Sequence, residues 1–182
     1  MNKKVLVITG SARFEGNSDL MADAFIQGAQ AAGNTVTKVE AAKLKLTPCR
    51  VCNTCYSKGV ACSYQDDFNQ IAPFIEEADV IAFATPLYWS SYPAQLKMII
   101  DKFYALCIGQ KSVENKSSCL LLCGEDNDDF VYSGLLDSYK SMANFLKWSD
   151  AGQLVMKGVN DKGQIKDTDG LKKAEELGRN IA

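Results

Sequence analysis

The residues that could do chemistry begin in the first loop of the chain, at positions 9–19. This loop follows a short apolar run that suits a buried strand, and a helix is expected to begin near Asn17. The loop carries the hydroxyls of Ser11 and Ser18, and a strand-to-helix turn also offers free backbone N–H groups. The positive end of the helix adds about half an elementary charge. This combination predicts a phosphate-binding site, in which the guanidinium of Arg13 could donate two hydrogen bonds to the phosphate.

What the loop lacks narrows the choice of ligand. A Walker loop needs lysine followed by Ser or Thr after its second glycine, but here Gly16 is followed by Asn17. A dinucleotide fingerprint needs a second glycine where this chain has Ala12. Nucleotide triphosphates and dinucleotides are therefore disfavoured, and a single terminal phosphate is predicted. An ordinary loop with a good helix cap is the alternative.

A second group of residues lies just beyond the next buried strand, which is expected at 79–85. The residues that follow this strand are Pro86, Leu87, Tyr88 and Trp89. Ligands of open α/β sheets bind outside the carboxyl ends of the strands, so this bend is expected beside the phosphate loop, where its rings could stack on a planar ligand. Packing against the protein is the alternative. Gly124, after a further strand at 118–123, could let backbone approach the same ligand.

Composition excludes several classes of chemistry. The 182 residues include no histidine, so Ser-His-Asp and Cys-His nucleophilic sites and His-ligated metal sites are excluded. A bound redox cofactor can react without histidine, because the cofactor carries out the chemistry and the protein mainly positions it and sets its electrostatic surroundings. The net charge of −2 gives no general reason to expect nucleic acid or an anionic membrane as a partner. Seven cysteines, an odd number in a chain without the character of a disulfide scaffold, favour a reducing cytoplasm.

The apolar pattern predicts the scaffold that positions these loops. Strand-like runs alternate with helical patterns along the chain, which is typical of an α/β fold with a doubly wound parallel sheet. A helix that follows Pro93 has the expected core face Leu96, Ile99, Ile100 and Phe103. The length fits one domain better than two, so we expect a single domain over residues 1–182 with a Cys-rich insertion at about 47–65.

Three stretches together resemble the NADPH-dependent FMN reductase and iron-sulfur flavoprotein branch of the flavodoxin-like superfamily. They are the phosphate loop at 10–18, the aromatic bend at 85–89 and the end of a helix at 96–102. The similarity extends over nearly the whole chain. It implies a flavodoxin-like three-layer α/β sandwich with a five-stranded parallel sheet in the order 2-1-3-4-5, helices on both faces, and FMN at the switch point between the first and third strands.

The same resemblance implies a binding site, residue by residue. The FMN phosphate would be held by Ser11, Arg13, Asn17 and Ser18. The isoalloxazine ring would be lined by Pro86, Leu87, Tyr88 and Trp89 and flanked by Gly124. Many relatives have Pro at the position of Ala12 and Arg at the position of Lys102. Lysine at position 102 lacks the planar guanidinium with which arginine binds a carboxylate through two hydrogen bonds, so an ion pair at that position is less certain.

The cysteine run Cys49-x2-Cys52-x2-Cys55-x6-Cys62 resembles the compact run that binds [4Fe-4S] in iron-sulfur flavoproteins. A structural or free-thiol loop is the stronger alternative. Zinc is disfavoured because its ligand pairs usually straddle a longer gap. The other cysteines, interpreted as buried small hydrophobes, are Cys107, Cys119 and Cys123.

These residues predict a cytoplasmic FMN-dependent oxidoreductase that passes a hydride from NAD(P)H to flavin N5 and then to a small-molecule acceptor, such as a quinone or free flavin. No side chain is nominated as acid or base. One chain covers an isoalloxazine poorly, so a homodimer or homotetramer is expected. Two alternatives stay open. One is an FMN electron-transfer protein with or without [4Fe-4S], and the other is a non-redox module that binds another phosphate.

Overall fold

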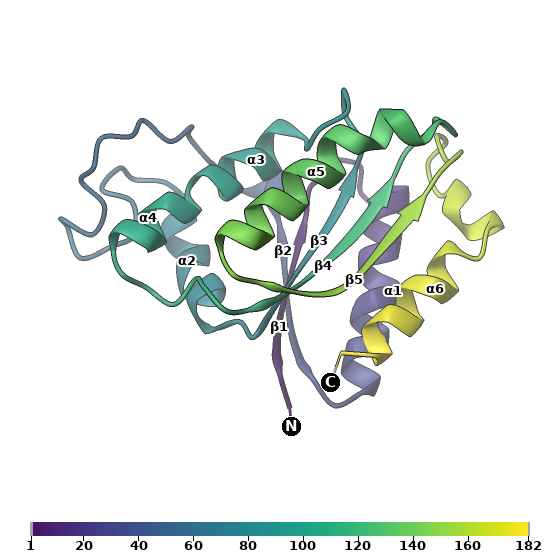
Figure 1. Cartoon of the computed structure of the whole chain (residues 1–182), viewed down its shortest axis with the longest axis horizontal. Coiled ribbons are helices and arrows are strands. Elements are labelled where there is room, and N and C mark those ends of the chain that lie inside the picture. Colours follow the sequence, from purple (N-terminus) through teal and green to yellow (C-terminus); the bar gives the residue numbers. More distant parts are fainter. Residues whose placement is uncertain (1, 182) are drawn as a thin grey trace.

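A five-stranded parallel sheet forms the centre of the computed structural model, which describes residues 2–181 (Figure 1). Its strands are β1 (Lys4–Thr9), β2 (Thr35–Glu40), β3 (Val80–Pro86), β4 (Ser117–Cys123) and β5 (Ser149–Met156). They lie in the order β2-β1-β3-β4-β5, and every neighbouring pair is parallel. The strand order implied by the flavodoxin-like resemblance is confirmed.

Helices cover both faces of this sheet, as parallel strands require of their connections (Figure 1). One face carries α1 (Asn17–Ala31) and α6 (Gly170–Arg179). The other face carries α2 (Phe68–Glu77), α3 (Ala94–Asp101), α4 (Phe103–Ile108) and α5 (Asp129–Phe145). Two short 3-10 helices, η1 (Ala41–Lys43) and η2 (Gln164–Asp167), complete the elements. The predicted three-layer α/β sandwich is confirmed.

Two hydrophobic clusters, one on each face, hold these layers together. The central strands β1, β3 and β4 are apolar runs buried on both sides, and their side chains alternate between the two clusters. The cluster under α2 to α5 takes Leu6, Ile8, Ile81, Phe83, Leu120 and Leu122. The cluster under α1 and α6 takes Val5, Val7, Val80, Ala82, Cys119 and Leu121. Alternate residues of each central strand therefore point to opposite faces of the sheet and contribute to different clusters.

Helices α1 and α6 approach each other closely through a pair of glycines. A Cβ added to Gly28 would lie 2.0 Å from the carbonyl oxygen of Glu175, and one added to Gly178 would lie 2.1 Å from the carbonyl oxygen of Phe25. Each glycine therefore faces the backbone of the opposite helix. Real Cβ atoms do not approach backbone oxygen so closely, so the two glycines set the spacing of this helix pair.

The structure corrects two local expectations. The helix predicted to continue from Leu96 through Phe103 is broken at Lys102, where a tight turn separates α3 from α4. Cys107 is exposed on α4, whereas Cys119 and Cys123 are buried as expected.

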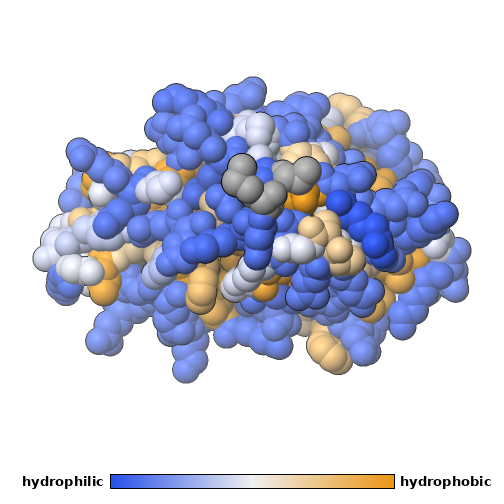
Figure 2. All heavy atoms as spheres, turned by 90° about the horizontal axis from the view of Figure 1, so that it is seen from below, coloured by the Kyte–Doolittle hydropathy of each residue, from blue (hydrophilic) through white to orange (hydrophobic). Residues whose placement is uncertain are grey.

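Figure 2 views the end of the sheet where the strands begin, and most of this face is hydrophilic with apolar groups scattered between polar ones. No helix within residues 2–181 has both the length and the apolar character needed to cross a membrane. The carboxyl ends of the strands lie on the opposite side of the molecule (Figure 1).

Candidate functional site

A cavity of about 540 Å³ opens at the carboxyl ends of the strands, between the loops that follow β1, β3, β4 and β5. Its volume lies within the usual range for small-molecule sites. All nine residues that the sequence placed at a cofactor site line this one cavity. They are Ser11, Arg13, Asn17, Ser18, Pro86, Leu87, Tyr88, Trp89 and Gly124. Segments that are far apart in the sequence therefore converge where an open α/β sheet binds its ligands.

The loop between β1 and α1 forms the polar end of the cavity. The hydroxyl of Ser11 accepts the backbone N–H of Arg13 at 3.0 Å, and the N–H of Gly16 bonds back to the carbonyl of Arg13 at 3.0 Å. These contacts fold the loop into a tight turn before α1. Gly16 is the N-cap and has no side chain to occupy the free N–H groups of the first helical turn. Together with the helix dipole, these donors suit an anion.

Asn17 behaves differently from the other polar residues of this loop. Its side chain is 9% exposed, and both ends of its amide bind protein backbone. Its Nδ2 donates to the carbonyl of Asp161 at 3.0 Å, and its Oδ1 accepts the N–H of Ile165 at 3.1 Å. The side chain therefore holds the segment between β5 and η2 against the phosphate loop, and the backbone of Asn17 is the part left to face the cavity.

The aromatic bend after β3 is a two-residue turn. Tyr88 and Ser91 pair across it through two backbone hydrogen bonds of 3.0 Å, and the central residues Trp89 and Ser90 have φ values of 49° and 57°. Such angles strain residues other than glycine, and they persist only where surrounding contacts hold them. The carbonyl of Ser90 lies against Gly134 of α5, which has no side chain to push it away. The turn thus carries Trp89, fully exposed, at the mouth of the cavity.

Several lining residues were not singled out from the sequence. They are Gly16, Ser90, Cys123, Glu125, Asp126, Val131, Val159, Asn160 and Lys162. Asn160 and Lys162 follow the edge strand β5, whose carboxyl end lies at the same side of the sheet, and this shared edge was the signal that could have identified them. Burial raises the pKa of the Cys123 thiol to about 12, so this thiol is neutral at ordinary pH.

The chemistry of this lining fits flavin mononucleotide. The loop after β1 and the segment after β5 offer the cations Arg13 and Lys162 with the hydroxyls of Ser11 and Ser18, which suits a phosphate. The bend after β3 offers Leu87 and its aromatic rings, which suit a planar ring system. Gly124 also lines the cavity, and a Cβ at this position would lie 2.8 Å from the hydroxyl of Tyr132, so this packing favours glycine here.

A second, smaller cavity lies at the Cys-rich segment. All four cysteines of the run line it, together with Lys102 and Tyr104. Within residues 2–181, however, no three His, Cys, Asp or Glu side chains lie close enough together to hold a metal ion. The four thiols are therefore of the type that binds an iron-sulfur cluster, but their side chains do not converge on one point.

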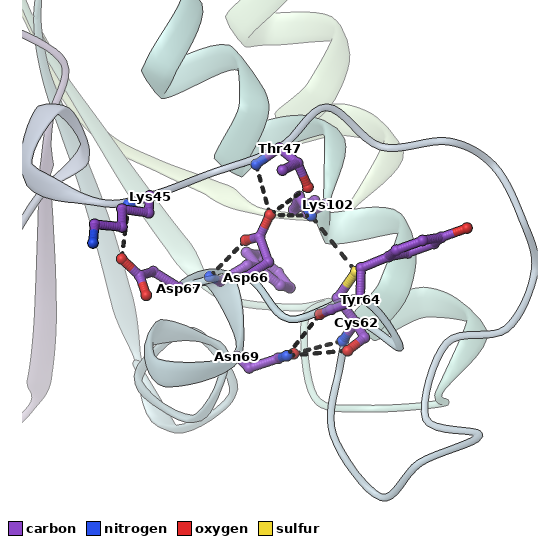
Figure 3. Close-up of polar contacts among 9 residues, drawn as sticks. Lys45, Thr47, Cys62, Tyr64, Asp66, Asp67, Asn69 and Lys102 are labelled. Carbon is purple, nitrogen blue, oxygen red and sulfur yellow. Dashed lines mark hydrogen bonds and ion pairs between the residues drawn. The ribbon is translucent and has the colours of Figure 1, made fainter.

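Asp66 and Lys102 form a buried ion pair beneath this segment (Figure 3). The Nζ of Lys102 lies 3.0 Å from Oδ2 of Asp66, and the two side chains are 3% and 0% exposed. The same carboxylate accepts the backbone N–H and the hydroxyl of Thr47, each at 2.6 Å, and the N–H of Phe68 at 2.9 Å. Burial alone would raise the pKa of Asp66, but these hydrogen bonds hold it below its ordinary value.

Further contacts secure the far end of the segment (Figure 3). The side-chain amide of Asn69 accepts the N–H of Cys62 at 2.6 Å and donates to its carbonyl at 3.0 Å. The backbone N–H of Lys45 donates to Asp67 at 2.7 Å. The Nζ of Lys102 also lies 3.6 Å from the sulfur of Cys62. Residues on both sides of the segment are therefore tied to the start of α2.

Comparison with known proteins agrees with this geometry. Residues 3–129 match the family model described as NADPH-dependent FMN reductase, which is well over half of the chain. The chain belongs to this family. It is accordingly an FMN-dependent NAD(P)H oxidoreductase.

Two relatives match over almost the whole of this chain. An iron-sulfur flavoprotein of Archaeoglobus fulgidus is 31% identical, over 98% of this chain and 79% of its own length. An iron-sulfur flavoprotein of Methanocaldococcus jannaschii is 29% identical, over 98% of this chain and 95% of its own. Among solved structures, the NAD(P)H:quinone oxidoreductase of Methanothermobacter marburgensis superimposes with a TM-score of 0.74 at 18% identity, over 100% of both chains. That structure supports the fold of this family member.

Proposed function

We propose that FMN binds in the cavity at the carboxyl ends of the strands, with its phosphate on the β1–α1 loop and its ring against the aromatic bend. The observation that carries this proposal is that anion donors and aromatic side chains from separate loops line one cavity. Bound FMN supplies the redox chemistry, because it can take a hydride from NAD(P)H at N5 and deliver the electrons to a second acceptor.

The residues of the chain bind and orient in this proposal. Ser11, Ser18 and the first turn of α1 hold the phosphate, and Arg13 adds a charge. Leu87 and the rings of Tyr88 and Trp89 cover the isoalloxazine, with Pro86 and the backbone of Gly124 at its edge. No histidine exists in the chain, so acceleration comes from position and from fixed dipoles rather than from an imidazole acid or base.

The electron acceptor we propose is a small molecule such as a quinone or free flavin. Trp89 is fully exposed at the cavity mouth, where an aromatic acceptor could stack on it. A homodimer or homotetramer in which a second copy covers this mouth would shield the ring from water. We also propose that the protein is cytoplasmic and has no nucleic-acid or membrane partner. The net charge of −2 and the free cysteines support this part of the proposal.

Rapid mixing with NADPH tests the function. The purified protein should carry or take up FMN, and anaerobic mixing should bleach its flavin absorbance much faster than the same concentration of free FMN. Bleaching that never outpaces free FMN would favour an electron carrier that reacts with protein partners. A colourless, folded protein that cannot take up FMN would contradict the flavin assignment and favour a non-redox module.

A second candidate function is electron transfer through FMN and a [4Fe-4S] cluster. Two observations favour this function. One cavity is lined by Cys49, Cys52, Cys55 and Cys62, and the two relatives described above are named iron-sulfur flavoproteins. Because no three of these thiols converge within residues 2–181, no step of the mechanism above is routed through a cluster.

Iron and sulfide assays after anaerobic purification and reconstitution test the cluster. A bound cluster requires about four irons and four sulfides per chain, and Cys55→Ser should lower both. Cys107→Ser is the matched control, because that cysteine lies on α4 outside the run. Less than about one iron per chain in the unaltered protein would retire this candidate.

A further inference from the structure

The segment between β5 and α6, residues 158–165, is internally organised by one side chain. The Oε1 of Gln164 accepts the backbone N–H of Asn160 at 2.7 Å and that of Asp161 at 3.0 Å, and its Nε2 donates to the carbonyl of Gly158 at 3.3 Å. These three contacts fix the backbone on either side of the tip, and the N–H groups of Asn160 and Asp161 are used within the segment.

This segment is fastened to the phosphate loop across the cavity end. The side-chain amide of Asn17 makes two hydrogen bonds to its backbone, at Asp161 and Ile165. The guanidinium of Arg13 donates to the carbonyl of Asn160 at 3.3 Å. Three hydrogen bonds thus bridge two loops that are more than 140 residues apart in the sequence. The tip of the segment is held beside the loop that offers donors to an anion.

Lys162 stands at that tip and lines the cavity. Its present contacts are weak. The Nζ lies 3.9 Å from the carboxylate of Glu15, where both side chains are more than half exposed, and 5.9 Å from the centre of the Phe14 ring. Ion pairs of this kind contribute little, so the ammonium group is available to a ligand of higher charge. Arg13 and Lys162 are the two cations among the described lining residues, and the carboxylates Glu125 and Asp126 come from the loop after β4.

We propose that Lys162 is a second cationic ligand of the flavin phosphate, and that Asn17 is a positioning residue that holds Lys162 in place. This inference rests on the proposed function, because it assumes FMN in the cavity. The recognition is of a terminal phosphate dianion, so Lys162 discriminates FMN from riboflavin, which has the same ring and no phosphate. The segment after β5 thereby becomes part of a phosphate site that is otherwise built on the β1–α1 loop.

Titration of the apoprotein with FMN and with riboflavin by isothermal calorimetry tests the role of Lys162. Lys162→Gln should weaken FMN binding about tenfold, or about 1.4 kcal/mol, and leave riboflavin within about twofold. Lys162→Arg should restore most of the FMN affinity. Lys166→Gln removes the same charge from the next turn, outside the cavity lining, and should bind both ligands as the unaltered protein does. Added salt should weaken FMN binding more in the unaltered protein than in Lys162→Gln.

The outcomes separate this inference from the function on which it rests. FMN affinity unchanged in Lys162→Gln, or an equal loss for FMN and riboflavin, would overturn the role of Lys162 while the FMN function stands. An unaltered protein that is folded and binds neither ligand would overturn both.

A double-mutant cycle tests the role of Asn17. If Asn17 acts by holding Lys162, Asn17→Ala should weaken FMN binding in the unaltered background and have little further effect in Lys162→Gln. Circular dichroism of each variant checks that the fold is intact. Equal effects of Asn17→Ala in the two backgrounds would overturn the positioning role.

Discussion

Replacing Lys102 by methionine is expected to lower the free energy of unfolding by about 3 kcal/mol, measured by urea titration followed by far-UV circular dichroism. Methionine fills much of the same volume, but it leaves the buried Asp66 carboxylate without its cation. Losing one partner of a buried pair typically costs about 3 to 5 kcal/mol. We expect the low end of that range, because the donors from Thr47 and Phe68 remain.

Lys97→Met is the matched control for this change. Lys97 pairs with Asp101 on the exposed side of α3, so its loss should cost no more than about 0.5 kcal/mol.

The free energy that the buried pair contributes to folding should depend on pH in a defined direction. Because the pKa of Asp66 is lowered from its ordinary value of 3.8, its contribution to stability is present above that value and is lost as the pH falls through the lower, folded value. The free energies of unfolding of Lys102→Met and Lys97→Met should therefore approach each other in strong acid. A cost below about 1 kcal/mol for Lys102→Met at neutral pH would contradict the buried pair.

Replacing Gly28 by alanine is expected to destabilise the protein by about 2 to 3 kcal/mol, measured in the same way. Alanine would gain about 1 kcal/mol of helix propensity within α1. Its Cβ, however, would lie 2.0 Å from the backbone oxygen of Glu175, and a helix backbone cannot yield locally as a flexible side chain can. Helices α1 and α6 would have to move apart, so the packing loss outweighs the gain in propensity.

Gln27→Ala provides the comparison, because Gln27 is exposed on the same helix and should change stability by less than about 0.5 kcal/mol. Gly178→Ala should resemble Gly28→Ala, since it enforces the same separation from the other side. The two changes together should cost less than their sum, because one displacement relieves both contacts. Increased stability of Gly28→Ala would mean that the helix pair is not held at this spacing.

The architecture could be predicted from the sequence because it depends on local periodicity. The buried strands are continuous apolar runs, and the loops that follow them must meet at one edge of a parallel sheet. For this reason Ser11 and Trp89, which lie far apart in the chain, could be assigned to one cavity. That argument needs only the direction of the strands, not the details of packing.

What the sequence did not reveal depends on contacts between distant residues. The amide of Asn17 bonds to Ile165 across 148 positions, and no local pattern marks that choice. The resemblance indicated an ion pair at position 102 but not its partner, because Asp66 lies 36 positions away and no local pattern joins it to Lys102. Lys162 follows an edge strand with a weak apolar pattern, and its place at the cavity emerges only when the segment after β5 is fastened down.

The two tryptophans of the chain occupy opposite environments, and each can serve as an intrinsic fluorophore. Trp148 is buried against Phe83 and Phe103, and its indole N–H donates to the carbonyl of Val113 at 2.6 Å. Trp89 stands in water at the cavity mouth. Emission from Trp148 should be blue-shifted and should report on the core, whereas emission from Trp89 should be red-shifted and quenched when an aromatic ligand arrives. The protein thus carries separate optical probes of unfolding and of cavity occupancy.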